Sequence, residues 1–391
     1  MRIAIVVHGR FHAFDLARAL RRRGHDVLVV TNLPQRRAAA WDLPRAAIRS
    51  LPVEGAINAV AARAGASVYA ALDAPLHLWF GRWAARRLLP GPWDLVVAFS
   101  GVAAETLLLA RRHGWPTLCT RSSAHIRVQD RILAEEEART GRRIQRPTRW
   151  KIEREEREYG LATAVQVPST FVRGTFQEMG VPLERTLLVP LGVEVADFRA
   201  SAQVLAARLA RIEEGQPLRV LCAGSLSLRK GMYDLAAAVQ RLPDGVFQFH
   251  LVGDVTRAAR SWVDAMRDRI RITSRVPQEE LPGIYEEADV LVLPTLEDGF
   301  AVVLAQALAA GVPIVTTPHS AGPDLVEEGR TGWIVPVRDP EALAARLLAL
   351  HHDRPLLAAA VRALAERPGL RDWDDMAADY ERFARAMKES G

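Results

Sequence analysis

Two loops in the second half of the chain carry residue types suited to binding phosphate. The first, residues 224–231, begins and ends with glycine and contains Arg229 next to Lys230. Arginine can bind a phosphate through its planar guanidinium, and lysine offers a compact positive charge. We therefore expect Arg229 and Lys230 to contact a diphosphate.

The second loop adds hydroxyl-binding groups to the start of a predicted helix. Gln306 lies eight residues beyond Asp298, about two helical turns, so the two side chains share one face. A carboxylate and an amide both bind hydroxyl groups. Between them are residues whose backbone amides, unpaired at a helix start, favour an anion: Gly299, Phe300, Ala301 and Val302. This loop predicts a ligand that is both phosphorylated and rich in hydroxyls.

Both loops follow an apolar run that predicts a buried strand, at residues 219–223 and 290–293. Helix-forming residues follow each loop. In an open α/β sheet, ligands bind beyond the carboxyl ends of the strands. We therefore expect the two loops to meet at the same edge of one sheet.

The first half of the chain opens with a β-α-β pattern, and further strands are predicted at residues 94–99, 116–120 and 164–168. This alternation predicts a doubly wound α/β domain. The opening turn lacks the G-x-G-x-x-G fingerprint, which argues against a dinucleotide oxidoreductase. The stretch at about 191–217 separates this αβ series from the second one and predicts a domain boundary.

Composition is consistent with two globular domains, because 391 residues exceed one typical core. No apolar run reaches the roughly 18–20 residues that a spanning helix needs. Cys119 and Cys222 lie in apolar runs without metal-ligand spacing. The chain enters a predicted strand directly after Met1. These features predict a reduced, cytoplasmic location.

Positive charge is concentrated in the first half of the chain. Residues 1–190 contain 29 Lys and Arg against 17 Asp and Glu, whereas residues 191–391 contain 23 against 29. The basic half could face membrane lipid, nucleic acid or a phosphorylated glycan, or could consist of solvated arginine-rich helices. No nucleic-acid-binding motif or aromatic stacking run accompanies the charge, so no nucleic-acid partner is expected.

Three other segments favour structural roles. Residues 121–158 mix arginine and glutamate at helical spacing, which predicts an exposed helix with i,i+4 ion pairs. The His351-His352-Asp353 run closes a predicted helix and favours a solvated end over a metal site. Aromatic and apolar residues at 373, 376, 380 and 383 form a stripe on the last predicted helix and favour a core position.

The second half of the chain closely resembles the retaining glycosyltransferases of family 4, which have the GT-B fold. The matching residues are Gly224, Lys230, Gly231 and the segments 251–254, 285–294, 298–308 and 322–336. The first half matches more loosely, through His12, Leu16, Ala17, Gly24, His25 and the segments 122–125, 167–169 and 189–192.

This resemblance implies two Rossmann-like domains that face each other across a cleft. The acceptor-side domain would comprise residues 1–195 plus a terminal helix at about 371–391 that crosses back, and the nucleotide-sugar-binding domain residues 196–370. The implied reaction is transfer of a hexosyl group from a nucleotide-sugar, with retention and without a metal cofactor. Basic side chains and helix amides would stabilise the leaving diphosphate.

The resemblance also implies roles for individual residues. Lys230 matches the family's phosphate-binding lysine, and Asp298 matches the first acid of its Glu-x7-Glu motif, which holds the donor sugar. Gln306 matches the second acid, which binds the ribose. His125 matches a histidine near the reacting centre. The amides of residues 299–302 would bind the donor, and Gly9 and His12 belong to the predicted acceptor loop.

The chain departs from the family pattern at four positions. Asp298 and Gln306 stand where the family has glutamates, which could change the preferred donor sugar. Ser225 replaces a usual arginine, and we hypothesise that Arg229 supplies that charge. Of the family's paired N-terminal glycines only Gly9 remains, which leaves the acceptor class open.

Two alternatives to a transferase remain. One is a GT-B enzyme of another type, such as an epimerase or a phosphorylase. A phosphorylase needs a lysine for pyridoxal phosphate, and the chain has only Lys151, Lys230 and Lys388. The other is a sugar-nucleotide-binding protein without transferase activity. For a transferase, we expect a glycan, small-molecule or lipid-linked acceptor. The basic first half suggests an anionic acceptor or peripheral membrane contact through arginines such as Arg18, Arg21, Arg22, Arg23, Arg36 and Arg37.

Overall fold

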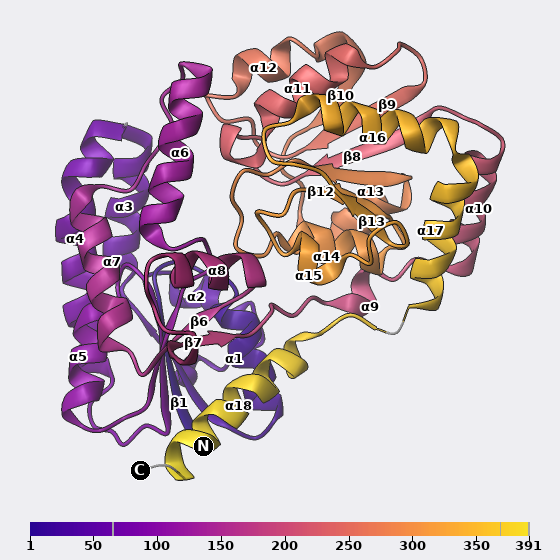
Figure 1. Ribbon diagram of the computed structural model, residues 1–391. Coiled ribbons are helices and arrows are strands. Elements are labelled where there is room, and N and C mark those ends of the chain that lie inside the picture. The colour runs from indigo at the N-terminus through magenta and orange to yellow at the C-terminus, as the bar shows by residue number, and fades with distance from the viewer. Residues whose placement is uncertain (65, 368, 390–391) are drawn as a thin grey trace.

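A computed structural model describes residues 1–64, 66–367 and 369–389 (Figure 1), apart from the side chains of residues 62–64, 66, 67 and 69. The chain forms two parallel β-sheets, each covered by helices. The first sheet has seven strands in the order β3-β2-β1-β4-β5-β6-β7, and the second has six in the order β10-β9-β8-β11-β12-β13. This arrangement confirms the predicted pair of doubly wound α/β domains.

The first sheet contains β1 (Arg2–Val7), β2 (Asp26–Thr31), β3 (Ile48–Ser50), β4 (Leu95–Phe99), β5 (Thr117–Thr120), β6 (Ala164–Val167) and β7 (Thr186–Leu188). Around it lie α1 (Ala13–Arg22), α2 (Gln35–Ala39), α3 (Pro52–Ala64), α4 (Ala66–Arg87), α5 (Ala104–Arg112), α6 (Ile126–Thr140), α7 (Arg149–Leu161) and α8 (Thr170–Glu178), with 3-10 turns η1 (Arg45–Ala47) and η2 (Leu183–Arg185). Central strands such as β1 are apolar without alternation and buried on both faces, as a parallel sheet between two helix layers requires.

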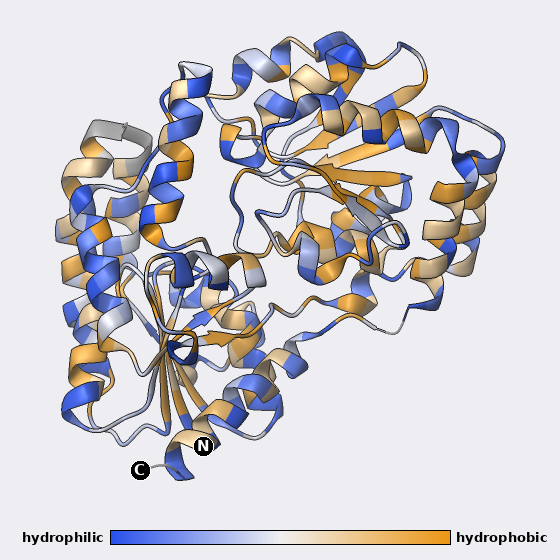
Figure 2. Cartoon of the chain, viewed as in Figure 1, coloured by the Kyte–Doolittle hydropathy of each residue, from blue (hydrophilic) through white to orange (hydrophobic). Residues whose placement is uncertain are grey.

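The second sheet contains β8 (Leu218–Ala223), β9 (Phe247–Val252), β10 (Ile270–Thr273), β11 (Val290–Leu293), β12 (Ile314–Thr316) and β13 (Gly332–Ile334). Its helices are α9 (Val195–Phe198), α10 (Ala202–Glu213), α11 (Met232–Arg241), α12 (Arg260–Asp264), α13 (Leu281–Glu286), α14 (Val302–Ala309), α15 (Gly322–Leu325), α16 (Pro340–His352) and α17 (Arg354–Glu366), with 3-10 turns η3 (Leu228–Lys230), η4 (Arg267–Arg269) and η5 (Gln278–Glu280). Figure 2 shows the strands largely in hydrophobic colours at the centre of each domain.

The last helix, α18 (Trp373–Glu389), returns to the first domain and packs along α1 (Figure 1). Its Met376 and Tyr380 are fully buried in the core of that domain. Ion pairs from Arg22 to Asp374 and from Arg23 to Glu381 hold the two helices together. The predicted crossing and the predicted core role of the aromatic stripe are therefore confirmed.

The charged segment 121–158 corrects one expectation. It forms two helices, α6 and α7, rather than one exposed helix, and several of its charges are buried. The Glu158 carboxylate accepts hydrogen bonds from the amides of Gly101, Ala103 and Ala104 at the start of α5. Burial raises the pKa of Glu158 to about 8. The acid therefore caps a helix inside the first domain.

Helix α6 reaches the second domain at its far end (Figure 1). There Arg139 binds both carboxylate oxygens of Asp234 on α11, each at 2.8 Å, and also pairs with Glu136. Its guanidinium lies over the ring of Tyr233. Because Asp234 and Glu136 are buried, this contact fixes the position of α6 against the second sheet.

A second contact between the domains centres on the buried carboxylate of Glu297. It accepts hydrogen bonds from the Ala124 amide at 2.8 Å and Gln129 Nε2 at 3.0 Å, both in the first domain. In its own domain it pairs with Arg229 Nη1 at 2.9 Å. Burial alone would raise the pKa of Glu297, but Arg229 and the Ala124 amide bring it below its ordinary value. The carboxylate is therefore held in its charged form between the domains.

We predict that Glu297→Gln destabilises the protein by about 2 kcal/mol at neutral pH, because the charged acceptor of three hydrogen bonds is lost. Since the folded pKa is depressed, this stabilisation is complete above the ordinary value of 4.5 and disappears as the pH falls further. Denaturant unfolding of both proteins across this pH range measures the difference. The exposed Glu279→Gln is the control, and an equal loss in both variants would contradict the assigned contact.

Candidate functional site

The two predicted phosphate-binding loops lie against each other beyond the ends of β8 and β11, which are paired in parallel. The Arg229 carbonyl accepts hydrogen bonds from the Leu296 amide at 2.9 Å and the Thr295 hydroxyl at 3.2 Å. Gly231 has φ +79°, and a side chain there would collide with the Pro294 carbonyl. The prediction that the loops share one sheet edge is confirmed, and glycine is required for their close approach.

Lys230 and Asp298 face each other across this junction. The Lys230 ammonium contacts one carboxylate oxygen of Asp298, and both side chains are largely buried. Burial lowers the pKa of Lys230 well below its usual range, and the neighbouring Arg229 adds to the effect. Any closely bound anion stabilises the charged form of a lysine in this position, because the anion offsets the free-energy cost of burying the charge.

The other oxygen of Asp298 binds the start of α14. It accepts hydrogen bonds from the amides of Phe300 at 3.3 Å and Ala301 at 3.1 Å. Ala301 has the left-handed φ of +58°, which few residues other than glycine adopt. The Asp298 carboxylate thus occupies a position surrounded by an ammonium group and helix amides, and this combination suits a phosphate.

The remaining predicted donor residues have other contacts. Arg229 turns toward Glu297 rather than Asp298, and its side chain is 32% exposed. Gln306 is buried on α14, where its side-chain oxygen accepts a hydrogen bond from the Tyr285 hydroxyl at 3.1 Å. Phe300 packs into the core of the first domain, and a side chain at Gly299 would collide with the Ser122 carbonyl. The second loop therefore also forms part of the domain contact.

A cavity of about 510 Å³ lies between the domains. It is lined mainly by loops at the carboxyl ends of the first sheet and by α4, α6 and α7, and Arg229 contributes from the second domain. Phe11 borders it within the predicted acceptor loop. Of the predicted residues beside Phe11, the Gly9 amide donates to Asn32 Oδ1 at 2.6 Å. The His12 ring packs on Phe99, and burial lowers its pKa to about 3.

His125 does not line this cavity. It is the N-cap of α6, where its ring Nδ1 accepts a hydrogen bond from the Arg127 amide at 3.4 Å, and its buried ring packs against Tyr159 and Phe176 inside the first domain. Burial lowers the pKa of His125 to about 4. The structure therefore does not bring His125 together with Lys230 and Asp298, because the side chain turns inward from the loop after β5.

Arg121, Ser122 and Ser123 of that loop line the cavity, and the sequence interpretation missed Arg121. Its guanidinium pairs with Glu155 at 2.8 Å and donates to Gln129 at 2.7 Å. Because Gln129 in turn binds Glu297, a continuous polar network runs from the cavity wall to Arg229. The sequence offered one signal for Arg121, which is its position as the first residue beyond strand β5. Ligands bind beyond the carboxyl ends of the strands in such a sheet.

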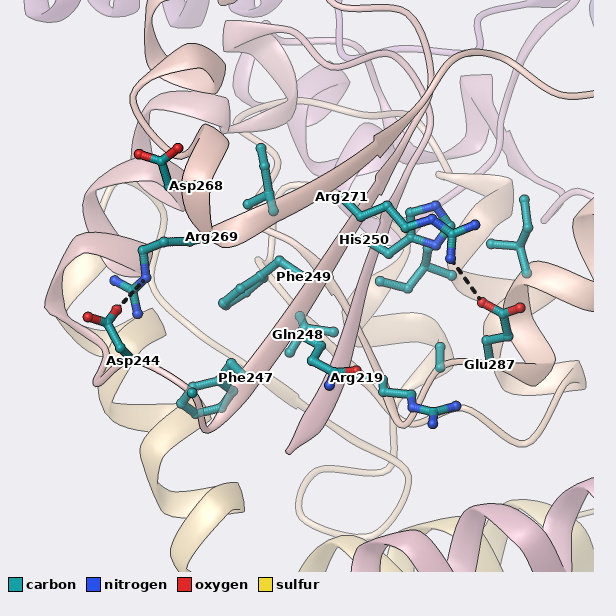
Figure 3. Close-up of a pocket in the computed structure, with 16 residues that line it drawn as sticks. Arg219, Asp244, Phe247, Gln248, Phe249, His250, Asp268, Arg269, Arg271 and Glu287 are labelled. Carbon is teal, nitrogen blue, oxygen red and sulfur yellow. Dashed lines mark ion pairs between the residues drawn. The ribbon is translucent and has the colours of Figure 1, made fainter. Parts of the chain in front are cut away.

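A larger cavity, of about 720 Å³, lies elsewhere in the second domain (Figure 3). It is formed by the amino-terminal parts of β8 and β9 together with η4, the start of β10 and the end of α13. Arg271 and Glu287 form an ion pair at its edge. Because the two phosphate-binding loops follow the carboxyl ends of the strands, this cavity is not the predicted donor site.

Comparison with known proteins agrees with this arrangement. Residues 10–197 match the family model for glycosyltransferase family 4, and residues 217–353 match that for group 1 glycosyl transferases. The chain is 32% identical over 186 residues to WcaL of Salmonella typhimurium, named as a colanic acid biosynthesis glycosyltransferase. It is 31% identical over 184 residues to the amylovoran biosynthesis glycosyltransferase AmsK of Erwinia amylovora. The chain spans about half the length of these relatives, with 44% of WcaL and 43% of AmsK covered.

Solved structures share the fold over the whole chain. Sucrose-phosphate synthase from Thermosynechococcus elongatus aligns with a TM-score of 0.74 at 20% identity, covering all of both chains. HepE from Anabaena, solved in complex with UDP, aligns with a TM-score of 0.68 at 16% identity and the same coverage. The two family models between them cover both domains. This chain belongs to the family 4, or group 1, glycosyltransferases and has the GT-B fold.

Proposed function

We propose that this protein is a retaining, metal-independent hexosyltransferase that moves a sugar from a nucleotide-sugar to a glycan, small-molecule or lipid-linked acceptor. The observation that carries this proposal is the anion position at the junction of the two loops. There the Lys230 ammonium and the amides of Phe300 and Ala301 converge on one carboxylate. A donor diphosphate has the charge and the acceptor oxygens to take that position.

The comparisons support the type of donor and the biosynthetic setting. HepE has been solved with UDP, with UDP and glucose, and with UDP-glucose. WcaL and AmsK are named for the biosynthesis of colanic acid and amylovoran. We infer a nucleoside-diphosphate sugar as donor and a role in cell-envelope or glycoconjugate biosynthesis.

The proposed chemistry needs charge stabilisation more than proton transfer. When the bond between the anomeric carbon and the diphosphate breaks, negative charge grows on the leaving oxygen. Lys230 and the amides at the start of α14 would stabilise this charge without a metal ion. Arg229 would assist from the cavity side, and Gln306 would bind the ribose through its amide.

Asp298 has two successive roles in this proposal. Without donor, its carboxylate neutralises Lys230 and caps the amides of Phe300 and Ala301. An arriving diphosphate needs the same groups and must displace the carboxylate. Once displaced, Asp298 can accept hydrogen bonds from hydroxyls of the donor sugar. We therefore expect Asp298 to lower the affinity for the donor, because its carboxylate competes with the diphosphate. We also expect it to orient the donor sugar once the diphosphate is bound.

We predict that Lys230→Ala and Asp298→Asn change binding of UDP or GDP, whichever binds the unsubstituted protein, in opposite directions. Loss of the ammonium should weaken binding about tenfold or more, because a charge-assisted contact is lost. Loss of the competing carboxylate should tighten binding roughly tenfold, although Asp298→Asn should also slow sugar transfer. Isothermal titration measures these affinities, with the surface variant Lys388→Ala as control. Unchanged affinity in Lys230→Ala would contradict the phosphate role.

Arg229→Gln separates donor binding from domain contact. We predict that it weakens nucleotide binding less than Lys230→Ala and lowers stability through the lost Glu297 pair. Titration and denaturant unfolding of the same variant report the two effects. A loss of affinity as large as that of Lys230→Ala, with unchanged stability, would instead assign Arg229 mainly to the donor.

We predict that His125→Asn retains nucleotide release within about threefold, because asparagine also caps a helix well and the ring lies outside the cavity. Nucleotide release from a panel of nucleotide-sugars measures this. A loss of about a hundredfold, typical of removing an acid–base group, with an unchanged melting temperature would restore a catalytic role for His125.

A non-catalytic sugar-nucleotide-binding protein is the second candidate, favoured by the replacement of both motif glutamates by Asp298 and Gln306. Slow hydrolysis of the bound donor without acceptor separates the two functions. A transferase releases nucleotide in this assay. Whether the reaction retains the anomeric configuration is tested separately, by determining the configuration of the transferred sugar with NMR. A protein that binds the donor and never releases nucleotide with any acceptor would favour the second candidate.

A further inference from the structure

The helical hairpin α3–α4 on the outside of the first domain (Figure 1) exposes an apolar surface. The described part of the chain has ten exposed large hydrophobic residues, and half of them are on this hairpin. We call them the hairpin face: Val53 (60% exposed), Ile57 (40%) and Val60 (63%) on α3, and Val68 (43%) and Trp79 (41%) on α4. Such clustering marks an interaction site more often than scattered single residues do.

Helical spacing places the members of the hairpin face together on each helix. Val53, Ile57 and Val60 recur after four and three residues, so they lie along one side of α3. Val68 and Trp79 are eleven residues apart, about three turns, and also share one side of α4. Each helix therefore presents an apolar side to the surroundings.

Among the described side chains of α3 and of α4 as far as Trp79, none carries an exposed charge. Among the hairpin side chains that the structure describes, Glu54 and Asp73 carry the charges before Arg82, and both are buried. Glu54 binds His8 and Asn32, and Asp73 lies beside His77. An ordinary surface helix has a polar outer face, so solvent alone does not explain this composition.

Arginines follow the apolar surface along α4. Arg82 and Arg86 lie three and seven residues beyond Trp79, on the same side of the helix, and both are exposed. The order along α4 is apolar residues, an aromatic ring and then cations. Tryptophan and arginine side chains beside an apolar surface suit the level of the lipid headgroups in a membrane.

Three of the six arginines first expected to contact an anionic partner have protein partners instead. Arg18 pairs with Glu194, Arg22 with Asp374 and Arg23 with Glu381. These pairs hold α1 against the segment that precedes α9 and against α18. The basic character of the first half therefore does not by itself identify the docking surface, whereas on the hairpin the apolar residues of the hairpin face are followed by the exposed Arg82 and Arg86.

We propose that the hairpin face docks on an anionic lipid bilayer, with its apolar residues in the interface and Arg82 and Arg86 at the headgroups. The described helices include none that is both long and apolar enough to cross a bilayer, so the contact would be peripheral. Ala70 and Asp73 of the same helix line the interdomain cavity. A bilayer at the hairpin face would therefore lie next to α4 and the cavity, where a lipid-linked acceptor could enter. The docking inference itself does not depend on the transfer reaction.

Vesicle flotation of the full chain tests this inference. We compare vesicles of phosphatidylcholine alone with vesicles of equal parts phosphatidylcholine and phosphatidylglycerol. The unsubstituted protein should float with the anionic vesicles, and binding should weaken as salt rises because the arginine contribution is screened. Ile57→Ser/Val60→Ser/Trp79→Ser should lower binding about tenfold or more, because apolar area no longer leaves water.

Two matched variants separate the contributions. Leu183→Ser/Ile272→Ser removes exposed hydrophobic residues outside the hairpin and should bind as the unsubstituted protein does. Arg82→Gln/Arg86→Gln should lose most of its preference for anionic vesicles. Melting temperatures and UDP affinity, measured without vesicles, should remain unchanged in all three variants, so a folding or donor-site defect is distinguishable.

Three results would overturn the proposal. The first is absence of flotation with anionic vesicles, and the second is equal loss in the hairpin and control variants. The third is a dimer in light scattering that the hairpin variant dissociates while vesicle binding persists, since this would assign the hairpin face to a second copy of the chain.

Discussion

The buried carboxylate of Glu297 is the contact on which the arrangement of the site depends. It joins the Ala124 amide and Gln129 of the first domain to Arg229 of the second. A buried charge is tolerated only when its hydrogen-bonding capacity is satisfied. The two domains must therefore keep one relative position at this contact. The next residues, Asp298 and Gly299, are thereby placed against Lys230 and against the Ser122 carbonyl. The domain contact and the anion position are thus built from one short loop.

Because one loop forms both the domain contact and the anion position, a ligand at one of them is expected to affect the other. Arg229 and Lys230 are neighbours, yet one neutralises the acid between the domains and the other faces the acid at the start of α14. A bound diphosphate would redistribute charge at both contacts at once, so donor binding and the fit between the domains are expected to be coupled. The α6 helix, held on the second domain by Arg139 and Asp234, would keep the domains paired during such an exchange.

The fold could be predicted because its signals are local. Apolar strands, helix-forming runs and the glycines at positions 224 and 231 place Lys230 and Asp298 at one sheet edge without tertiary knowledge. The partners of charged groups could not be predicted in this way. Glu158 lies in a run that has the composition of a solvated helix, yet it caps α5 inside the domain. The motif match at His125 gave the position of the residue along the chain but not the rotation that buries its ring against Phe176.

The most direct test is a crystal structure of this protein with a bound nucleoside diphosphate. We expect the terminal phosphate within hydrogen-bonding distance of Lys230 Nζ and of the amides of Phe300 and Ala301, with the Asp298 carboxylate moved off the lysine. A nucleotide bound instead in the cavity between β9 and α13, with Lys230 still in contact with Asp298, would contradict the proposed donor site.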